Sequence, residues 1–315
     1  MPRTVAPARR HTARNRRLRV TAAFAVLVAV AGYLTVQYVT GGKGSDQCTV
    51  ESADGSAGEG RTYRLSSEQA ANAAVISAVG TTRGMPERAV TIALATALQE
   101  SGLRNIEHGD RDSLGLFQQR PSQGWGTEKQ ILDPVYSSGK FYQHLAEVPG
   151  YSRLPLTVAA QRVQRSGFPQ AYAKHEPDAA LLAAALTGRT PAALNCDPPR
   201  TTAGTGEMAK VRAELLRSFG KDVLPSGKGA DAQAPAAGAA AGTGTLSVPV
   251  RAALRAGQDG APQRGWELAH WAVAQSEALG LDEVAYAGRT WDAGSGWRTE
   301  RKESGTGAVR MRLAQ

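Results

Sequence analysis

A single glutamate, Glu100, stands where an apolar helix is expected to give way to a polar loop. The residues before it are mostly alanine, leucine, isoleucine and valine, and the loop from 102 to 130 is rich in glycine, aspartate, proline and serine. Apolar surroundings remove water from a carboxylate and favour its protonated form. A glutamic acid that keeps its proton can act as a general acid on the oxygen of a glycosidic bond. The sequence therefore predicts an enzyme that cuts sugar polymers, with Glu100 as proton donor.

Several short helices are expected to position this residue. Ser66 and Gln69 form a capping-box pattern at the start of one helix, and Pro86 suits the first turn of the next. Gly102 can end that second helix, so that Glu100 lies in its last turn. Further helices are expected at 133–147, 156–166, 169–186 and 206–219. The region is predicted to be mostly α-helical, with one long functional loop.

The positive charge of the chain is concentrated at its N-terminus. Residues 1–19 carry seven arginines and no acid, and so account for most of the net charge of +9. Residues 20–39 are free of charge and long enough to cross a bilayer as a helix. The arginines favour a cytoplasmic N-terminus, which places the rest of the chain outside the cytoplasm. Ala29-Val30-Ala31 leaves open the alternative of a signal peptide that is cleaved after export.

The two cysteines, Cys48 and Cys196, lie at the two ends of the candidate catalytic region. Both are on the exported side in this topology, so a single disulfide between them is expected. Two isolated cysteines lack the paired spacing of a zinc site. We expect no metal and no cofactor.

The composition divides the chain into six segments. They are a basic cytoplasmic tail (1–19), a transmembrane helix (20–39), a stalk (40–64), a catalytic domain (65–221), an Ala/Gly/Pro linker (222–246) and a small α+β accessory module (247–315). One spanning segment cannot by itself line a transport path. The arginines would face anionic lipid in the cytoplasm, which argues against binding to nucleic acid.

Two blocks in the catalytic domain resemble a known group of enzymes. Glu100-Ser101 followed by Gly115-Leu116-Phe117-Gln118 resembles the Glu-Ser … Gly-Leu-Met-Gln signature of the lysozyme-like lytic transglycosylases. Gly109-Asp110-Arg111 resembles a segment of the goose-type lysozymes. The resemblance covers about residues 66–190. The fold it implies is mainly α, a lysozyme-like helical domain with a long active-site loop.

The resemblance implies cleavage of the β-1,4 bond between N-acetylmuramic acid and N-acetylglucosamine in peptidoglycan. Glu100 would protonate the leaving oxygen. The reaction would be completed either by groups of the substrate, giving an anhydro-sugar, or by a water that a carboxylate in the position of Asp110 helps to activate. Residues expected to contact the glycan are Ser101, Gly115, Leu116, Phe117, Gln118, Gln119, Trp125 and Gln161.

The chain departs from the family at one point. The soluble transglycosylases carry an Ala-Tyr-Asn-Ala-Gly segment after the loop, with a tyrosine that reaches the acid. Residues 159–164, Ala-Ala-Gln-Arg-Val-Gln, stand in its place here, and Gln161 is the candidate to replace the tyrosine. This difference affects the transglycosylase assignment more than the site itself.

Each of these residues also has a structural interpretation. Glu100 could be a surface residue paired with Arg104 or Arg111, and Asp110 and Asp112 could be turn formers. Gln118 and Gln119 could bond the loop backbone, and Trp125 could pack the loop. These alternatives remain open at this stage.

The C-terminal module resembles the later part of a domain related to zinc D-Ala-D-Ala peptidases. The matching pieces are Gly265-Trp266, Ala269-His270-Trp271, Gly288-Arg289-Thr290-Trp291 and Gly296-Trp297. The zinc ligands of an active member are missing, and residues 309–313 stand where a histidine-containing strand would be. We expect a non-catalytic accessory module, with His270 on a helix face and not in a metal site.

Two functions from different classes are carried forward. The first is a membrane-anchored peptidoglycan glycosidase, whose partners are glycan strands and, through one helix, the cytoplasmic membrane. The second is a catalytically inactive peptidoglycan-binding or scaffold protein of the cell envelope. Protein partners are not predicted.

Overall fold

A computed structural model describes residues 47–52, 60–198, 207–224, 244–251, 260–300 and 305–314. The predicted basic tail (1–19) and transmembrane helix (20–39) lie outside these residues, as does most of the predicted linker (222–246). Among the helices that are described, none combines the length and the apolar character needed to cross a membrane.

The described chain alternates between helices and short strands. The helices are α2 (Ser67–Thr82), α3 (Glu87–Ser101), α4 (Glu128–Ile131), α5 (Pro134–Ala146), α6 (Leu156–Gln164), α7 (Glu176–Leu186), α8 (Met208–Phe219), α9 (Gly260–Ala274) and α10 (Ser276–Leu279). Single 3-10 turns or short runs are η1 (Pro121–Gln123), η2 (Tyr151–Arg153), η3 (Pro169–His175) and η4 (Lys221–Val223). The strands are β1 (Cys48–Glu51), β2 (Thr62–Leu65), β3 (Leu194–Cys196), β4 (Thr245–Pro249), β5 (Leu281–Tyr286), β6 (Arg289–Asp292), β7 (Gly296–Thr299) and β8 (Ala308–Leu313).

The prediction of a mainly α fold is wrong. Helix makes up about 51% of the structure and strand 17%, and the strands form two antiparallel sheets, so the fold is mixed α/β. The strands of the first sheet have three or four residues each, too few for an alternating pattern to show in the sequence. Their partners lie far along the chain, which local patterns do not reveal.

The first sheet, in the order β2-β1-β3, carries the disulfide. Cys48 and Cys196 face each other in the register of β1 and β3, and their sulfurs are bonded. The predicted disulfide is thus confirmed. It closes a loop across a sequence separation of 148 residues, which in the chain-entropy model stabilises the fold by roughly 4–5 kcal/mol. The predicted stalk (40–64) contains β1 and all but the last residue of β2.

Helix α2 starts and packs as its sequence dictates. The Ser66 side chain accepts from the Gln69 backbone and the Gln69 side chain accepts from the Ser66 backbone, which completes the predicted capping box. The helix continues past Gly80 to Thr82. Gly80 lies under Tyr142 of α5, where a Cβ atom would come within 2.6 Å of the tyrosine oxygen. Glycine at this position therefore permits close packing of two helices.

Helix α3 is the buried helix that leads to Glu100. Every residue from Ala89 to Leu98 is buried, as expected for a helix that is apolar nearly all round. Gly102 ends it in the left-handed conformation, with φ 63°. Since α2 and α7 pack against α3, the last turn of α3 is held firmly at the point where the loop begins.

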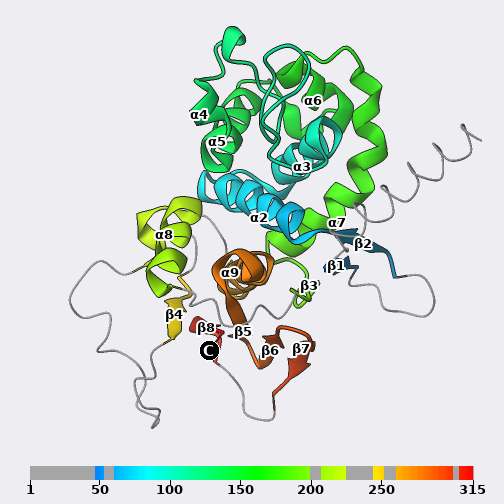
Figure 1. The fold of residues 1–315 in the computed structure, drawn as a ribbon. Coiled ribbons are helices and arrows are strands. Elements are labelled where there is room, and N and C mark those ends of the chain that lie inside the picture. The colour runs from blue at the N-terminus through cyan, green and yellow to red at the C-terminus, as the bar shows by residue number, and fades with distance from the viewer. Residues whose placement is uncertain are drawn as a thin grey trace, which may run out of the picture. The chain divides into compact units, whose positions relative to one another are not determined.

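The second sheet has the order β4-β8-β5-β6-β7. Helix α9 packs against β5 and β8 of this sheet and also contacts α2, α7 and β3. In Figure 1, α9 (orange) lies between the sheet and α2 (blue), and the helices around Glu100 lie on the other side of α2. The strand β4 begins at Thr245, inside the range predicted as linker.

Candidate active site

Glu100 is half-buried in the last turn of α3 and bonded to a tyrosine from a distant part of the chain. The hydroxyl of Tyr172, in η3, donates to Glu100 Oε1 at 2.6 Å. Burial, together with this hydrogen bond to Glu100, raises the pKa of the Tyr172 hydroxyl. Tyr172 therefore stays a neutral donor, and it fixes one carboxyl oxygen of Glu100.

A second contact fastens η3 to the same turn of α3. His175 Nε2 lies 3.2 Å from Gln99 Oε1. Burial and the neighbouring Lys174 lower the pKa of the His175 imidazole, against the opposing charge of Asp178. Because neighbouring residues of α3 bind the two ends of the Tyr172–His175 segment, the position of the Tyr172 hydroxyl is well defined.

Neither arginine that could have paired with Glu100 does so in the described structure. Arg104 Nε donates to the Ser101 carbonyl oxygen at 3.4 Å, and Arg111 lies 3.9 Å from the Asp110 carboxylate. Glu100 is thus held by a neutral hydroxyl and has no cation partner there. This arrangement differs from that of an ordinary surface ion pair.

The loop after α3 is fixed to the helix by Ser101. Its hydroxyl is within bonding distance of the Leu116 carbonyl oxygen, at 2.8 Å, and of the Ala97 carbonyl oxygen, at 3.1 Å. Gly115 has φ +74°, and a Cβ atom there would come within 2.8 Å of the Ile131 carbonyl oxygen, so only glycine fits. Ser101 and Gly115 therefore bring the loop beside Glu100.

Leu116 and Phe117 belong to the core. Both side chains are fully buried, and the Phe117 ring stacks on Phe141 with centroids 4.7 Å apart. Their backbone oxygens are also bonded, the one of Leu116 to Ser101 and the one of Phe117 to Gln164 Nε2 at 2.7 Å. These two residues anchor the loop, and their side chains do not face solvent.

The two loop glutamines differ in burial. Gln119 is only 2% exposed, and its Nε2 donates to the Ser137 carbonyl oxygen at 3.0 Å. Gln118 is half-buried, has φ +47° and packs against Gly109, where a Cβ atom would overlap its Oε1. Gln119 thus has a structural role, and Gln118 is the more accessible of the two.

Trp125 packs the loop from the other side. Its ring lies 4.5 Å from the His144 ring, centroid to centroid, and its carbonyl oxygen accepts from the Tyr136 hydroxyl at 3.2 Å. The side chain is partly buried. These contacts favour the packing interpretation of Trp125.

The two aspartates of the loop have different environments. The Asp110 side chain is 94% exposed. Asp112 accepts from Arg120 Nε at 2.6 Å and from the Ser122 backbone at 2.8 Å. These bonds, the one to the Ser122 backbone first, hold the pKa of the Asp112 carboxyl well below its usual range. Asp112 therefore ties two parts of the loop together, whereas Asp110 makes no described contact with Glu100 or Tyr172.

Gln161 does not take the place of the family tyrosine. Its Nε2 donates to the Ser166 carbonyl oxygen at 2.8 Å, across the turn that follows α6. The tyrosine that reaches the acid is Tyr172, which the sequence interpretation missed. The available signal was the pair Ala171-Tyr172, the same dipeptide with which the family segment begins, eleven residues after Gln161.

Two further histidines, His108 and His270, make no described contact with Glu100. His108 is exposed, and His270 is fully buried in α9. His270 Nδ1 lies 2.7 Å from the Ala185 carbonyl oxygen, and its Nε2 accepts from the Ala193 backbone at 3.2 Å. Both ring nitrogens are thus used within the core. Among the described residues, no cluster of His, Cys, Asp or Glu is suited to hold a metal ion.

The comparisons with known proteins add no relative. No protein-family model matches the sequence, and a search of curated proteins likewise finds no match.

Proposed function

We propose that the protein cleaves the β-1,4 bond between N-acetylmuramic acid and N-acetylglucosamine in peptidoglycan, with Glu100 as the general acid. The observation that carries the proposal is the hydrogen bond from Tyr172 to Glu100 Oε1, 2.6 Å long, at the end of a buried helix. The loop that Ser101 attaches beside it matches the block whose sequence resembles the lytic transglycosylases. The substrate comes from that resemblance.

Tyr172 leaves Glu100 suited to proton donation. One carboxyl oxygen, Oε1, accepts the Tyr172 hydrogen bond, which leaves the other oxygen, Oε2, to carry the proton that the proposed reaction transfers. A rotationally fixed carboxylic acid can pass this proton to the glycosidic oxygen as the bond from C1 to that oxygen breaks. Half-burial removes part of the water that would otherwise solvate the carboxylate.

The second half of the reaction is proposed to use the substrate. A hydroxyl of the same sugar attacks C1 and returns its proton to the Glu100 carboxylate, so the sugar closes on itself and the acid is regenerated. The environment of Asp110 supports this route over hydrolysis. A carboxylate that is 94% exposed is poorly suited to orient a water against C1, since a general base must be held within hydrogen-bond reach of its target.

The disulfide supports a site of action outside the cytoplasm. Cys48 and Cys196 are bonded, and structural disulfides persist in oxidising compartments. Whether residues 20–39 anchor the chain or are removed as a leader is tested by cell fractionation and by sequencing the N-terminus of the exported protein.

The test is mass spectrometry of the soluble products released from purified cell-wall sacculi. We expect wild-type protein to release fragments with an anhydro end, and Glu100→Gln to release at least a hundredfold less, because general acid catalysis contributes roughly 10²–10⁴-fold. Circular dichroism and the melting temperature should be unchanged in the variant. Gln99→Glu serves as a matched control, since it adds a carboxylate one residue away and should not rescue Glu100→Gln.

Three outcomes separate the alternatives. Anhydro ends support the transglycosylase reaction, and reducing ends indicate a hydrolase. Binding to sacculi without any released fragment, by wild type and Glu100→Gln alike, would contradict the proposal and favour the inactive scaffold.

A further inference from the structure

The connection from α6 to η3 carries an exposed phenylalanine close to the candidate acid. Phe168 is 77% exposed, the most exposed large hydrophobic side chain in the described part of the chain. It lies four residues before Tyr172, whose hydroxyl bonds Glu100. Within a 3-10 run the rise is about 2 Å per residue, so Phe168 and the acid lie within the length of a short oligosaccharide.

The turn at residues 165–168 is rigidly built. Arg165 has φ +52° and ends α6 by donating its backbone N–H to Gln161. The Phe168 backbone donates to the Ser166 hydroxyl at 3.1 Å, and the Gln161 amide donates to the Ser166 carbonyl oxygen at 2.8 Å. The backbone bonds are thus satisfied locally, while the side chains of Arg165 and Phe168 are left exposed.

Both sides of the 165–168 turn are attached to the candidate active site. Immediately before the turn, Gln164 Nε2 donates to the Phe117 carbonyl oxygen at 2.7 Å. After the turn, the Tyr172 hydroxyl donates to Glu100. A surface held in place before binding loses less conformational entropy when a ligand arrives. The turn is therefore a preorganised edge of the site.

The charge of this region is entirely positive. Between Val148 and His175 there is no aspartate or glutamate, and the segment carries Arg153, Arg162, Arg165 and Lys174. All four side chains are exposed, and in the described structure none forms an ion pair. Elsewhere in the described structure some arginines, such as Arg64, Arg212 and Arg310, also lack an ion pair, whereas others pair with carboxylates, among them Arg61, Arg88, Arg120, Arg189, Arg217, Arg264, Arg298 and Arg312.

Arg162 and Arg165 are the two cations closest in sequence to the turn. Arg162 lies in the last turn of α6, and Arg165 is the left-handed residue that caps this helix. Exposed guanidinium groups without a protein partner suit carboxylates, which they bind bidentately. An exposed aromatic ring beside them suits the apolar face of a sugar ring.

We propose that Arg162, Arg165 and Phe168 form a binding surface for carboxylate-bearing glycan, and that the enzyme thereby selects strands that still carry their peptide stems. The two guanidinium groups pair with carboxylates of the stems, and Phe168 stacks on a sugar ring next to the bond that is cut. This inference rests on the proposed function, because it assigns the substrate class of the same site.

The test measures binding of the full chain in a Glu100→Gln background, so that cleavage does not deplete the ligand. The probes are sacculi treated with hydrofluoric acid, which removes phosphate-linked polymers, and the same sacculi after a carbodiimide and ammonia have converted the stem carboxylates into neutral amides. We expect the sacculi with free stem carboxylates to bind about tenfold more tightly, with a clear loss of binding as salt rises.

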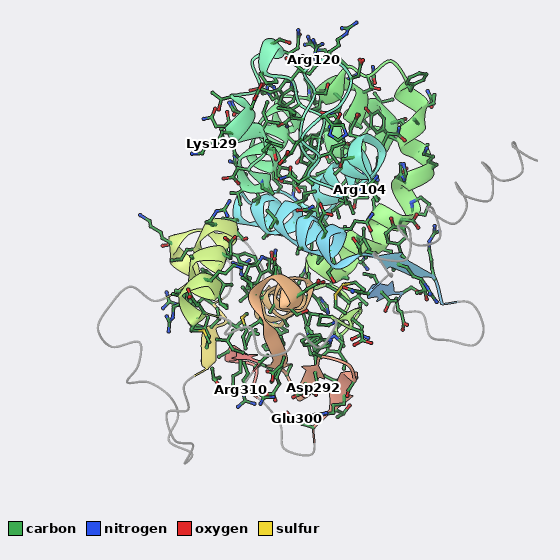
Figure 2. The ribbon with its side chains drawn as sticks, in the orientation of Figure 1. Arg104, Arg120, Lys129, Asp292, Glu300 and Arg310 are labelled. Atoms are coloured by element: carbon green, nitrogen blue, oxygen red, sulfur yellow. A yellow bond between two sulfur atoms is a disulfide. The ribbon has the colours of Figure 1, made fainter. Side chains whose placement is uncertain are left out.

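Substitutions test the contribution of each residue of the proposed surface. Arg162→Gln/Arg165→Gln should weaken binding to the sacculi with free stem carboxylates about tenfold, since exposed ion pairs contribute about 0.2–1 kcal/mol each. The double substitution should also remove the difference between the two probes. Phe168→Ser should weaken binding to both probes about equally. Arg310→Gln is the matched control: Arg310 is exposed on β8, at the opposite end of Figure 2 from Arg120 of the active-site loop.

The outcomes for the inference and for the proposed function are distinct. Equal binding of both probes by the parent chain, no effect of the arginine substitutions, or binding only to sacculi that keep their phosphate polymers would overturn the inference. The proposed function would survive each of these results if the wild-type chain still releases fragments. Conversely, stem-dependent binding through these arginines without any cleavage would retain the surface and reject the glycosidase.

Discussion

Two buried or half-buried glutamates, Glu100 and Glu267, have opposite surroundings. Glu267, in α9, is only 4% exposed. It accepts from Arg264 at 2.6 Å and from the Thr81 hydroxyl of α2. Burial raises the pKa of the Glu267 carboxyl, and the pair with Arg264 opposes this. Both oxygens of Glu267 are therefore used by the fold.

Glu100 also accepts a hydroxyl hydrogen bond, from Tyr172, but it lacks a cation partner in the described structure and is only half-buried. A carboxylate with a nearby arginine and no access to solvent is a structural lock between elements. A carboxylate held by a neutral donor, with one oxygen left over at the surface, can exchange protons with a ligand. If Glu100 acts as the proposed general acid, the partner of each acid, more than its burial, separates the two roles.

The first prediction uses mutation to separate the structural role of Glu267 from the catalytic role proposed for Glu100. Glu267→Gln should lower the free energy of unfolding by about 3 kcal/mol, because it leaves the charge of Arg264 without its partner in the core. Urea denaturation measures this loss. The specific activity of the folded fraction should stay within twofold of wild type, opposite to the effect expected for Glu100→Gln.

A double substitution sharpens this prediction. In Arg264→Met/Glu267→Leu both charges are removed, and apolar replacements of a buried pair are often neutral. Most of the stability lost in Glu267→Gln should return. A Glu267→Gln variant with full stability, or with lost activity at full stability, would show that Glu267 is not a lock.

The second prediction concerns His270, which lies next to this lock in α9. Burial lowers the pKa of His270 from the ordinary value of 6.5 to about 4. The unfolded chain therefore takes up a proton before the folded chain does, and stability is lost as the pH falls from 6.5 to 4. The shift corresponds to about 3 kcal/mol. Denaturation curves at several pH values measure it.

The matched control is His144 on α5, which is half-buried against Trp125. In His270→Asn the loss of stability between pH 6.5 and 4 should be smaller by about 3 kcal/mol, whatever the stability at neutral pH. His144→Gln should keep the wild-type slope. Parallel curves for wild type and His270→Asn would refute the assignment of this pH dependence to His270.

The third prediction compares the hydroxyl partners of the two glutamates. Tyr172→Phe removes one hydrogen bond to Glu100 and should lower kcat about tenfold, or about 1.4 kcal/mol in the barrier, with little change in KM. Thr81→Val removes the corresponding bond to Glu267. It should lower the free energy of unfolding by about 1–2 kcal/mol and leave kcat unchanged.

Steady-state rates on soluble glycan oligomers give kcat for both variants, and thermal melts give the stability of both. If Tyr172→Phe loses only stability, Tyr172 is a packing residue and the proposed role of Glu100 loses its main support.

The accuracy of the sequence predictions varied with the range of the contacts involved. The capping box at Ser66, the end of α3 at Gly102 and the position of Glu100 follow from neighbouring residues, and the structure has them as predicted. The disulfide was foreseen because the chain holds only two cysteines. The capping and helix-end signals lie within a few residues of the feature they predict. Two cysteines allow only one disulfide pairing within the chain.

The misses involve long-range pairing. Strand β1 pairs with β3 across almost the whole helical region, and β4 pairs with β8 across residues 250–307. The Tyr172–Glu100 bond joins residues 72 apart. Neither the composition of residues 40–64 nor that of 222–246 indicates strands, because four or five residues gain their β structure from partners that the local sequence does not contain.

The smallest expected effect belongs to Asp110 and decides between the two reaction routes. Its side chain is 94% exposed, so Asp110→Asn should change kcat by less than twofold if the substrate closes on itself without a base from the protein. Asp112→Asn is the matched control on the same loop, since Asp112 holds Arg120 and the Ser122 backbone. Its loss should loosen the loop and reduce activity more. If Asp110→Asn instead costs tenfold or more and the products carry reducing ends, a water attacks C1. The loop would then have to bring Asp110 toward Glu100 when glycan binds.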